Sequence, residues 1–398
     1  MTITTQAEFL TLLKGATFLA SGGGGPYSLA KEIVETYLND NTAFSISLIN
    51  IDTLTQDDWG CIAAGMAAPS KGIGLTPKDI VEPTVNAVTA MDTLIQKVYS
   101  NTKFDGFTSF NILVPIEVGA INVVIPLITA YRLQKNITVV DGDSAGRAVP
   151  TIELTTFASS QDVMPNMATS AGVEDFKFTT LSLESYTDLN TAYSQLIGAG
   201  LIGIDTGLAL APMNGTTLQD NNLVKNTLST AYEIGKIMEN DENTWIKITH
   251  IEDCLSSAMR GVKLLCTGKV VTYKTETIDD NDVGYMSIKT EDNRIFTVSI
   301  QNETITGQFE DETNIAVTGP DSICYLSTSN GALSDAEIYD NTLIQEKLAD
   351  GDDVEIHVIA IQADPVITSN EKLMTLWRSA YKTARYYGAY NSELWTTS

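Results

Sequence analysis

The stretch from Phe110 to Val140 constrains the fold of this chain more than any other. It has the pattern of an apolar strand over residues 110–114, a helix over residues 121–133 and a second strand over residues 137–140. Two strands joined through a helix run parallel in one sheet, because the crossover returns the chain to the end from which it left. The unit therefore predicts an α/β domain built on a mainly parallel sheet.

The residues around this unit continue the alternation of strand and helix. Strand-like runs occur at residues 44–51 and 61–65, and helix-like runs occur at residues 27–38 and 79–98. A chain of 398 residues exceeds the usual size of a single core, so two domains are the default expectation. We expect the N-terminal α/β domain, with its glycine-rich loop, to span residues 1–165.

The pattern changes in the second half of the chain. A helix is expected over residues 222–238, and from Gly268 onward apolar and polar residues alternate in short runs separated by Asp, Asn and Gly. A last helix-like run covers about residues 370–387. The sequence thus predicts a β-rich α+β C-terminal domain with a terminal helix over residues 166–398.

Four consecutive glycines, Gly22 to Gly25, stand just before Pro26 and a helical pattern. A run of glycines costs conformational entropy unless the backbone must take positive φ angles or approach another group closely. Proline marks the start of the helix, so the glycines form a loop at a helix N-terminus, where bare N–H groups favour an anion. A tight corner between two helices, without a ligand, explains the run equally well.

Candidate functional residues follow three predicted strands. Ligands bind beyond the carboxyl ends of the strands in open parallel sheets, and three loops leave those ends, at residues 65–71, 115–122 and 141–147. They bring one group of polar residues to the same crevice: Lys71, Glu117, Asn122, Asp141, Asp143 and Arg147. Carboxylates there could bind a divalent cation, act as a general base or hold a substrate N–H, and Arg147 could fix an anionic substrate.

Structural roles compete with these functional ones. Asp141 and Asp143 could cap the next segment or shape a turn, and Arg147 could neutralise one of them. Glu117 is harder to explain in this way. It stands in an apolar run, where an unpaired charge would be expensive, so a functional role is favoured.

The few histidines and cysteines restrict metal and nucleophile chemistry. Only two histidines exist, His250 and His357, so a site with three histidine ligands is impossible. His250 and Cys254 are four residues apart and could share a helix face as metal ligands or as a nucleophile–base pair. The metal candidates are Asp141, Asp143, His250 and Cys254, whereas the scattered cysteines are otherwise expected to be reduced thiols.

Charge and hydropathy narrow the classes of partner. The net charge is −26, from 24 Lys and Arg against 50 Asp and Glu, with no basic block. Nucleic acid and anionic membranes are therefore not expected as partners. No secretory signal pattern and no long apolar span are visible, so we expect a cytoplasmic protein, and a homo-oligomer on general grounds.

Several motifs, in this order along the chain, resemble those of a known family. They are the segments 18–26 (FLASGGGGP), 114–119 (VPIEVG), 140–150 (VDGDSAGRAVP), 301–303 (QNE) and 319–326 (GPDSICYL). The resemblance is to the S-methyl-thiohydantoin desulfurase-like family and runs over nearly the whole chain. It implies an N-terminal α/β domain that ends near Pro165, followed by a C-terminal domain.

The family resemblance also implies a function. The activity for which the family is named is hydrolytic removal of the sulfur substituent from a five-membered thiohydantoin ring. Its members are often encoded beside hydantoinase/oxoprolinase proteins, which implies a partner of that type. This chain departs from the family pattern at Ala120 and over residues 143–146, which line the expected site.

Two hypotheses follow for the function. The first is a hydrolase of a small cyclic amide or thiohydantoin-like ring, with a carboxylate as base or a carboxylate-held divalent metal as Lewis acid. The second is a non-catalytic small-molecule-binding or accessory subunit of a hydantoinase-type complex. The expected catalytic residues are Glu117, Asp141, Asp143 and Arg147, and the expected substrate-binding residues are Gly22, Gly23, Gly24, Gly25, Asn122, Asn302 and Glu303. Nucleotide binding at the glycine loop is disfavoured because the loop lacks a P-loop lysine.

Overall fold

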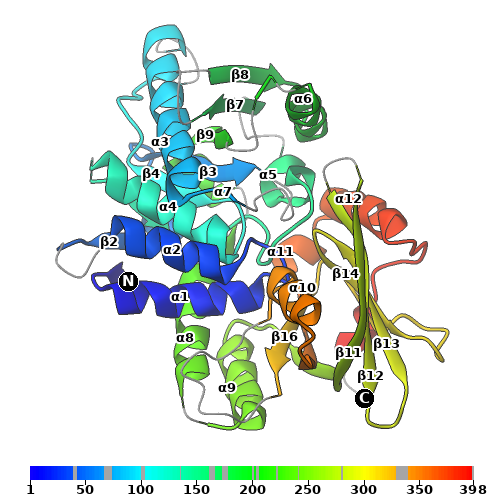
Figure 1. Ribbon diagram of the computed structural model, residues 1–398. Coiled ribbons are helices and arrows are strands. Elements are labelled where there is room, and N and C mark those ends of the chain that lie inside the picture. The colour runs from blue at the N-terminus through cyan, green and yellow to red at the C-terminus, as the bar shows by residue number, and fades with distance from the viewer. Residues whose placement is uncertain are drawn as a thin grey trace.

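The computed structural model describes residues 1–38, 43–66, 74–99, 104–134, 136–160, 166–172, 178–199, 201–202, 206–220, 223–240, 242–278, 281–328 and 339–396. Two large sheets organise these residues, one in each half of the molecule (Figure 1). In this part of the chain, no helix combines the length and the apolar character needed to cross a membrane.

The first sheet has eight strands. In spatial order they are β1 (Thr2–Ile3), β2 (Ile46–Ile49), β5 (Thr138–Val140), β4 (Ile112–Pro115), β3 (Trp59–Met66), β9 (Thr206–Asn214), β7 (Asn166–Ala171) and β8 (Phe178–Leu183). The four strands β2, β5, β4 and β3 run parallel, and the outer strands are antiparallel. The predicted parallel unit is thus confirmed, since β4 and β5 flank the crossover helix α4 (Ala120–Leu133).

Helices cover both faces of this sheet. On one face, α3 (Pro77–Leu94) and α4 share a core with the outer helices α1 (Gln6–Leu19), α2 (Tyr27–Tyr37), α8 (Thr227–Glu239) and α9 (Thr244–Ser256). On the other face lie α5 (Thr156–Ser159), α6 (Tyr186–Gly198) and α7 (Gly215–Asp220). A two-stranded ribbon, β6 (Gly142–Asp143) with β10 (Val224–Lys225), and the short turns η1 (Ile51–Thr53), η3 (Ile95–Tyr99) and η4 (Ile152–Leu154) complete this half.

The second sheet is an antiparallel half-barrel. Its spatial order is β15 (Val317–Thr318), β14 (Glu303–Phe309), β13 (Ile295–Gln301), β12 (Asn281–Thr290), β11 (Val262–Ile278), β17 (Glu355–Ile361) and β16 (Ser322–Ser327). Alternate side chains of these strands form its core, together with α10 (Asn341–Asp350). The segment ends in α11 (Pro365–Thr368), α12 (Glu371–Thr383) and η5 (Ser392–Trp395).

The predicted fold class is confirmed: an α/β domain is followed by a β-rich domain with a terminal helix. The predicted boundary falls at Pro165, which lies outside the described residues, and it stays a prediction. Strands β7, β8 and β9 follow that position in the chain and extend the first sheet. The helix predicted over residues 222–238 begins only at Thr227 in α8, because Asn226 has a left-handed backbone angle. The helix predicted over residues 370–387 ends at Thr383 in α12, and Arg385 just beyond it has a left-handed angle as well.

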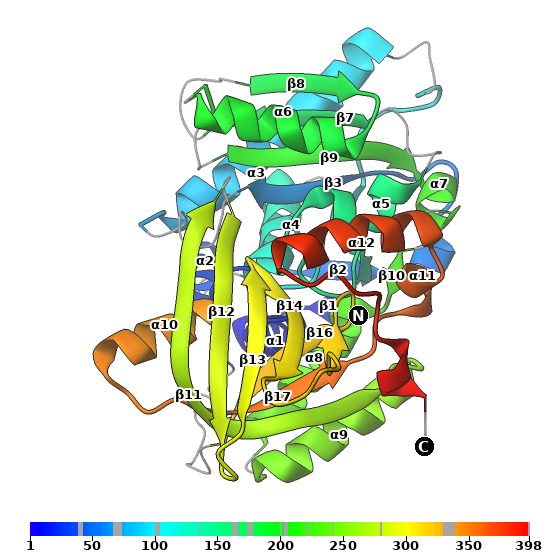
Figure 2. The ribbon, with the colours of Figure 1, turned by 90° about the vertical axis from the view of Figure 1, so that its right-hand side faces the viewer.

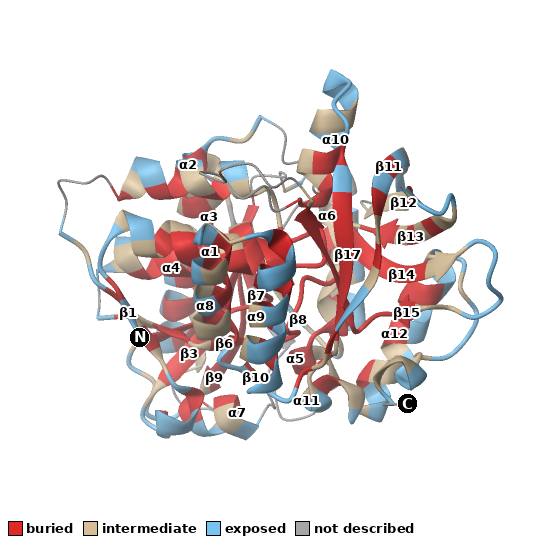
Figure 3. Ribbon diagram, turned by 90° about the horizontal axis from the view of Figure 1, so that it is seen from below, coloured by how far each residue is buried: buried red, intermediate tan, exposed pale blue. Residues whose placement is uncertain are grey.

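The two halves meet at the terminal helix. Leu373, Trp377 and Tyr381 of α12 pack with Val149 of the first half and with Ile305 of β14. Figure 2 shows α12 lying between the first sheet above and the strands of the half-barrel below. Figure 3 shows buried strands within both sheets, such as β17, whereas parts of β11 and the outer flank of α9 are exposed. The contact between the two halves is thus apolar at this point.

A glycine contact joins α1 to α8. A Cβ atom added at Gly15 would lie 1.7 Å from the carbonyl oxygen of Ala231, which is backbone and has no room to move. We predict that Gly15→Val lowers the free energy of unfolding by about 3 kcal/mol or more, because the helices must separate. Denaturant unfolding measures this, and Ala7→Val on the exposed side of α1 is the control for helix propensity. Equal stabilities of the two variants would contradict the close packing.

Candidate functional site

The glycine loop is a buried corner rather than an exposed anion cradle. Gly22, Gly24 and Gly25 have positive φ angles of 79°, 71° and 80°. The Cβ position of Gly24 lies 2.7 Å from the Cα of Gly119, so the loop touches the start of α4 backbone to backbone. The N–H of Ile121 donates to the carbonyl of Gly24 at 2.9 Å. The glycines are therefore needed both for backbone angle and for space.

The same loop binds the half-barrel. Ser21 accepts at its carbonyl from the N–H and the hydroxyl of Thr304, both at 3.0 Å. Its hydroxyl oxygen accepts from the N–H of Ile323 at 2.7 Å, and the carbonyl of Gly22 accepts from the N–H of Asn341 at 2.8 Å. The loop carbonyls thus connect the α/β domain to β14, β16 and α10.

Glu117 follows β4 and turns back toward this loop. It is 9% exposed, and one carboxylate oxygen accepts from the N–H of Val149 at 2.6 Å while the other accepts from Nδ2 of Asn122. Burial is the main cause that raises the pKa of Glu117 well above its ordinary value, and the nearby carboxyl of Glu303 raises it further. The sequence expectation of an expensive buried carboxyl at this position agrees with its surroundings.

Glu303 is the first residue of β14 in the half-barrel and faces the glycine loop. Its carboxyl lies over Gly23, whose Cβ position would be 2.3 Å from Oε1. Gly23 has no positive φ angle, so this position needs glycine only to leave space for the carboxyl. Burial raises the pKa of Glu303 to about 8, opposed by the charge of Arg147 and by the N–H of Gly24. No described residue donates a hydrogen bond to Oε2.

Arg147 is fully buried and donates to backbone carbonyls. Its guanidinium binds the carbonyl oxygens of Ala148 at 2.8 Å, Asp321 at 2.5 Å and Thr304 at 2.6 Å, and it lies 5.3 Å from the ring centroid of Trp377. Within the described residues it has no ion pair with a carboxylate. Its charge still reaches Glu117 and Glu303, because it lowers the pKa of both groups.

The two aspartates of the third loop have structural contacts. Asp143 is fully buried, accepts from the N–H groups of Ala145 and Gly146 at 2.6 and 2.5 Å, and has a pKa raised to about 6 by burial. Asp141 accepts from the N–H of Ser229 at 3.0 Å, which caps the first turn of α8. The structure thus brings Asp143 within electrostatic reach of Glu117, whereas Asp141 is directed to a helix N-terminus. A catalytic role for either stays a prediction.

The remaining predicted residues are distributed as follows. Asn302 is the residue between β13 and β14, and it turns the chain with a left-handed φ angle of 57°. Its Oδ1 accepts from the N–H of Asp282 in β12 at 2.8 Å. His250 pairs with Glu242 at 3.1 Å on the outer helix α9, and burial raises the pKa of the Cys254 thiol. Lys71 lies outside the described residues.

The predicted metal candidates do not assemble into a group of ligands. Among the residues that the structure describes, no three His, Cys, Asp or Glu side chains are close enough together to hold one ion. The four cysteines are free thiols.

Three residues at this junction were not predicted from the sequence as site residues. Asp340 caps α10 and also accepts from the N–H of Tyr27 at the start of α2. Asn341 contacts Gly22, and Asp321 accepts from Ala363, Tyr390 and Trp395. Asp321 stands in one of the family motifs, but Asp340 and Asn341 carry no signal other than a helix-capping pattern.

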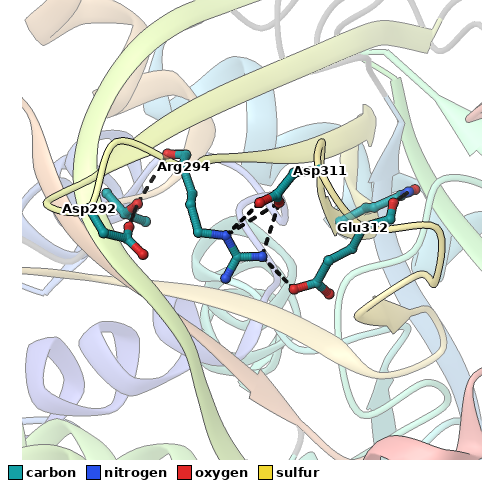
Figure 4. Close-up of polar contacts among 6 residues, drawn as sticks. Asp292, Arg294, Asp311 and Glu312 are labelled. Atoms are coloured by element: carbon teal, nitrogen blue, oxygen red, sulfur yellow. Dashed lines mark hydrogen bonds and ion pairs between the residues drawn. The ribbon is translucent and has the colours of Figure 1, made fainter.

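One charged cluster outside the junction is centred on Arg294, whose guanidinium is bound by neighbouring carboxylates. Figure 4 shows Arg294 of the β12–β13 turn between Asp292, Asp311 and Glu312. Its guanidinium binds Asp311 through two nitrogens, Nε and Nη2, each at 3.0 Å, donates to Glu312, and stacks 3.8 Å from the ring centroid of Phe309. This cluster connects neighbouring turns of the half-barrel and offers no unpaired group for a substrate.

The fold and the junction define a class: a two-domain protein with a pair of buried carboxyls, one from each domain, at a glycine loop. Two family models match the chain, the S-Me-THD-like N-terminal domain over residues 7–178 and the S-Me-THD-like C-terminal domain over residues 199–381. The chain therefore belongs to the S-methyl-thiohydantoin desulfurase-like family, as the sequence motifs predicted.

A solved structure has the same fold. The X-ray crystal structure of a protein from Chromobacterium violaceum is similar to this chain with a TM-score of 0.78 and 22% sequence identity, over 98% of this chain and 99% of that one. At this identity the likeness supports the fold alone. A comparison with curated proteins found no match.

The contrast between Gly23 and Gly24 can be tested directly. Gly24→Ala places a methyl group against backbone at a positive φ angle, so we predict a loss of about 2 kcal/mol or more of unfolding free energy. Gly23→Ala has ordinary backbone angles and meets only side-chain atoms of Glu303, from Cγ to Oε1, so it is predicted to cost less than Gly24→Ala. Thermal unfolding of both variants measures the difference. The reverse order would show that the loop is not packed in this way.

The raised pKa of Glu303 predicts a pH effect on stability. Between its ordinary value of 4.5 and about 8 the folded protein keeps a proton that the unfolded chain releases, so stability falls as pH rises through this range. Asp143, Asp321 and Asp340 have pKa values raised to about 6, so their own effect on stability is mostly complete below pH 6.5. The range from pH 6.5 to 9 therefore reports on Glu303. We expect the melting temperature of Glu303→Gln, relative to wild type, to rise across this range. A difference that does not change with pH would mean that Glu303 has an ordinary pKa.

Proposed function

We propose that this protein hydrolyses a small thiohydantoin-like or related cyclic amide ring, with Glu117 and Glu303 as its acid–base pair. The observation that carries the proposal is the pair itself: two buried carboxyls, one from each domain, in which the charge of Glu303 raises the cost of ionising Glu117. Strongly perturbed carboxyls that lie together are the groups from which enzymes build general acids and bases. Family membership supports the ring class.

The charges around the pair favour one bound proton at neutral pH. Arg147 is a cation whose charge acts on both Glu117 and Glu303. One carboxylate balances that charge, whereas two would leave a buried negative charge without a partner. The pair is therefore expected to titrate as a unit with one acid and one base.

The hydrogen bonds favour Glu117 as the base and Glu303 as the acid. Both oxygens of Glu117 accept from N–H donors, of Val149 and Asn122, which supports the ionised form. Glu303 leaves Oε2 without a donor among the described residues, and a pKa of about 8 keeps a proton on it at neutral pH. Neither arrangement needs a metal ion.

The chemical step then balances as follows for an S-methyl-thiohydantoin ring. Glu117 takes a proton from water, and the hydroxide adds to the ring carbon that carries the sulfur. The carbon–sulfur bond breaks as Glu303 donates its proton to the leaving thiolate. The remaining hydroxyl proton moves to the ring nitrogen of the former C=N bond, so the ring carbon keeps the water oxygen as a carbonyl and methanethiol leaves. The proton on Glu117 is then passed back to Glu303 through water.

Isosteric substitution tests the roles. We predict that Glu117→Gln and Glu303→Gln each lower the turnover of S-methyl-thiohydantoin by at least about 10²-fold, the usual contribution of a general acid or base. Glu82→Gln is the matched control, since Glu82 on α3 is also a hydrogen-bonded carboxylate, with Tyr37 and Arg132 as donors. The turnover of this variant should stay within about threefold of wild type.

The same measurement decides between catalysis and binding alone. Release of thiol is followed against a panel that also contains hydantoin and other cyclic amides. Turnover that survives both glutamate substitutions within about threefold would remove the pair from the mechanism. Ring binding without turnover by the wild-type protein would favour the alternative, a small-molecule-binding or accessory subunit.

A further inference from the structure

The first residue of α10 presents a buried acceptor that the acid–base pair does not use. Asn341 is 6% exposed, and its Nδ2 donates to the carbonyl of Asn302 at 3.2 Å. Only the amide nitrogen can donate to a carbonyl, so this bond fixes which end of the amide is the oxygen. The oxygen Oδ1 lies against Gly22, 2.7 Å from its Cβ position, and no described residue donates to it.

Two further buried oxygens without a described donor belong to Gln301 and Glu303, the residues on either side of Asn302, whose carbonyl accepts from Asn341. Glu303 stands over Gly23, the next residue of the loop, and its Oε2 has no donor among the described residues. Gln301 is opposite Glu303 in the β13–β14 register, so the two side chains leave the same face of the sheet. Its Oε1 is buried and equally without a donor in the described part of the chain. Buried amide oxygens without donors are costly, so those of Asn341 and Gln301 indicate an occupant that carries hydrogen-bond donors, while the protonated carboxyl of Glu303 can donate.

We propose that Asn341 Oδ1 accepts a hydrogen bond from a ring N–H of the substrate and so selects rings whose nitrogen is not alkylated. The proposal rests on the proposed function, because it places that ring beside Glu303. Hydantoin-like rings carry N–H groups next to their reactive carbons, which suits an amide oxygen that adjoins a carboxyl. An N-methyl ring has no hydrogen to donate there and would bury the Asn341 oxygen unpaired, a mismatch that such sites reject strongly.

Binding and turnover of matched rings test the proposal on the full chain. Calorimetry compares hydantoin with its N-methylated forms, and turnover compares S-methyl-thiohydantoin with its N-methylated counterpart. We expect wild type to prefer the N–H rings by at least about 30-fold, and Asn341→Leu to reduce this preference to within about fivefold. A purely structural role for Asn341 would lower all affinities together and leave the preference unchanged.

Two further variants complete the experiment. Asn391→Leu is the matched control, since that amide also donates to backbone carbonyls, of Ile315 and Ala316, and it should keep the wild-type preference. Gln301→Leu is the second test if Asn341→Leu fails to fold, and it should reduce the preference by at least about threefold.

The outcomes separate this proposal from the proposed function. Equal affinity of wild type for N–H and N-methyl rings, no ring binding at all, or an unchanged preference in Asn341→Leu would overturn it. Stabilisation of wild type by NaCl or KCl but not by choline chloride, lost in Asn341→Leu, would assign the oxygens to a cation and also overturn it. Selective binding without turnover would support the acceptor role while removing the hydrolase function.

Discussion

One buried guanidinium holds the two domains of this protein in register. Arg147 leaves the α/β domain and donates to the carbonyl oxygens of Thr304 and Asp321 in the half-barrel. Thr304 in turn donates to the carbonyl of Ser21, at the start of the glycine loop. Glu303 is the neighbour of Thr304 in β14, so the position of its carboxyl over Gly23 depends on the same chain of hydrogen bonds. Loss of this guanidinium would therefore disturb the site through the lost contacts to backbone carbonyls alone.

The same arginine explains how carboxyls can be buried here. An isolated buried carboxylate is costly, and two of them close together cost more than two alone. Arg147 supplies one positive charge without pairing directly to either group, because backbone carbonyls occupy its donors. The resulting field lowers the pKa of both glutamates but does not return either of them to its ordinary value. When both carboxyls are ionised, at high pH, they share the charge of one guanidinium and leave one negative charge unbalanced. This unbalanced charge is the physical basis of the proposed acid–base pair.

Much of the fold could be predicted from the sequence, and part of the junction could not. The parallel unit around α4 follows from local periodicity, and Glu117 was noticed because a charge in an apolar run is unusual. The direction of Asp141 toward α8 could not be predicted, since it depends on a helix that begins 86 residues later at Thr227. Asn341 escaped notice for a similar reason. Its contact with Gly22 joins residues from opposite ends of the chain, and no spacing rule connects them.

The proposed acid–base pair would be a property of the contact between the domains rather than of either domain. Glu117 stands on the α/β side and Glu303 on the half-barrel side, and each loses its water because the glycine loop closes between them. In a separated α/β domain, Glu117 would lose the charge of Glu303, which raises its pKa. The chemistry would therefore exist only where the halves are docked. The loop glycine that faces the other domain is Gly23, because a Cβ atom there would meet the side chain of Glu303 and push the start of β14 away from the loop.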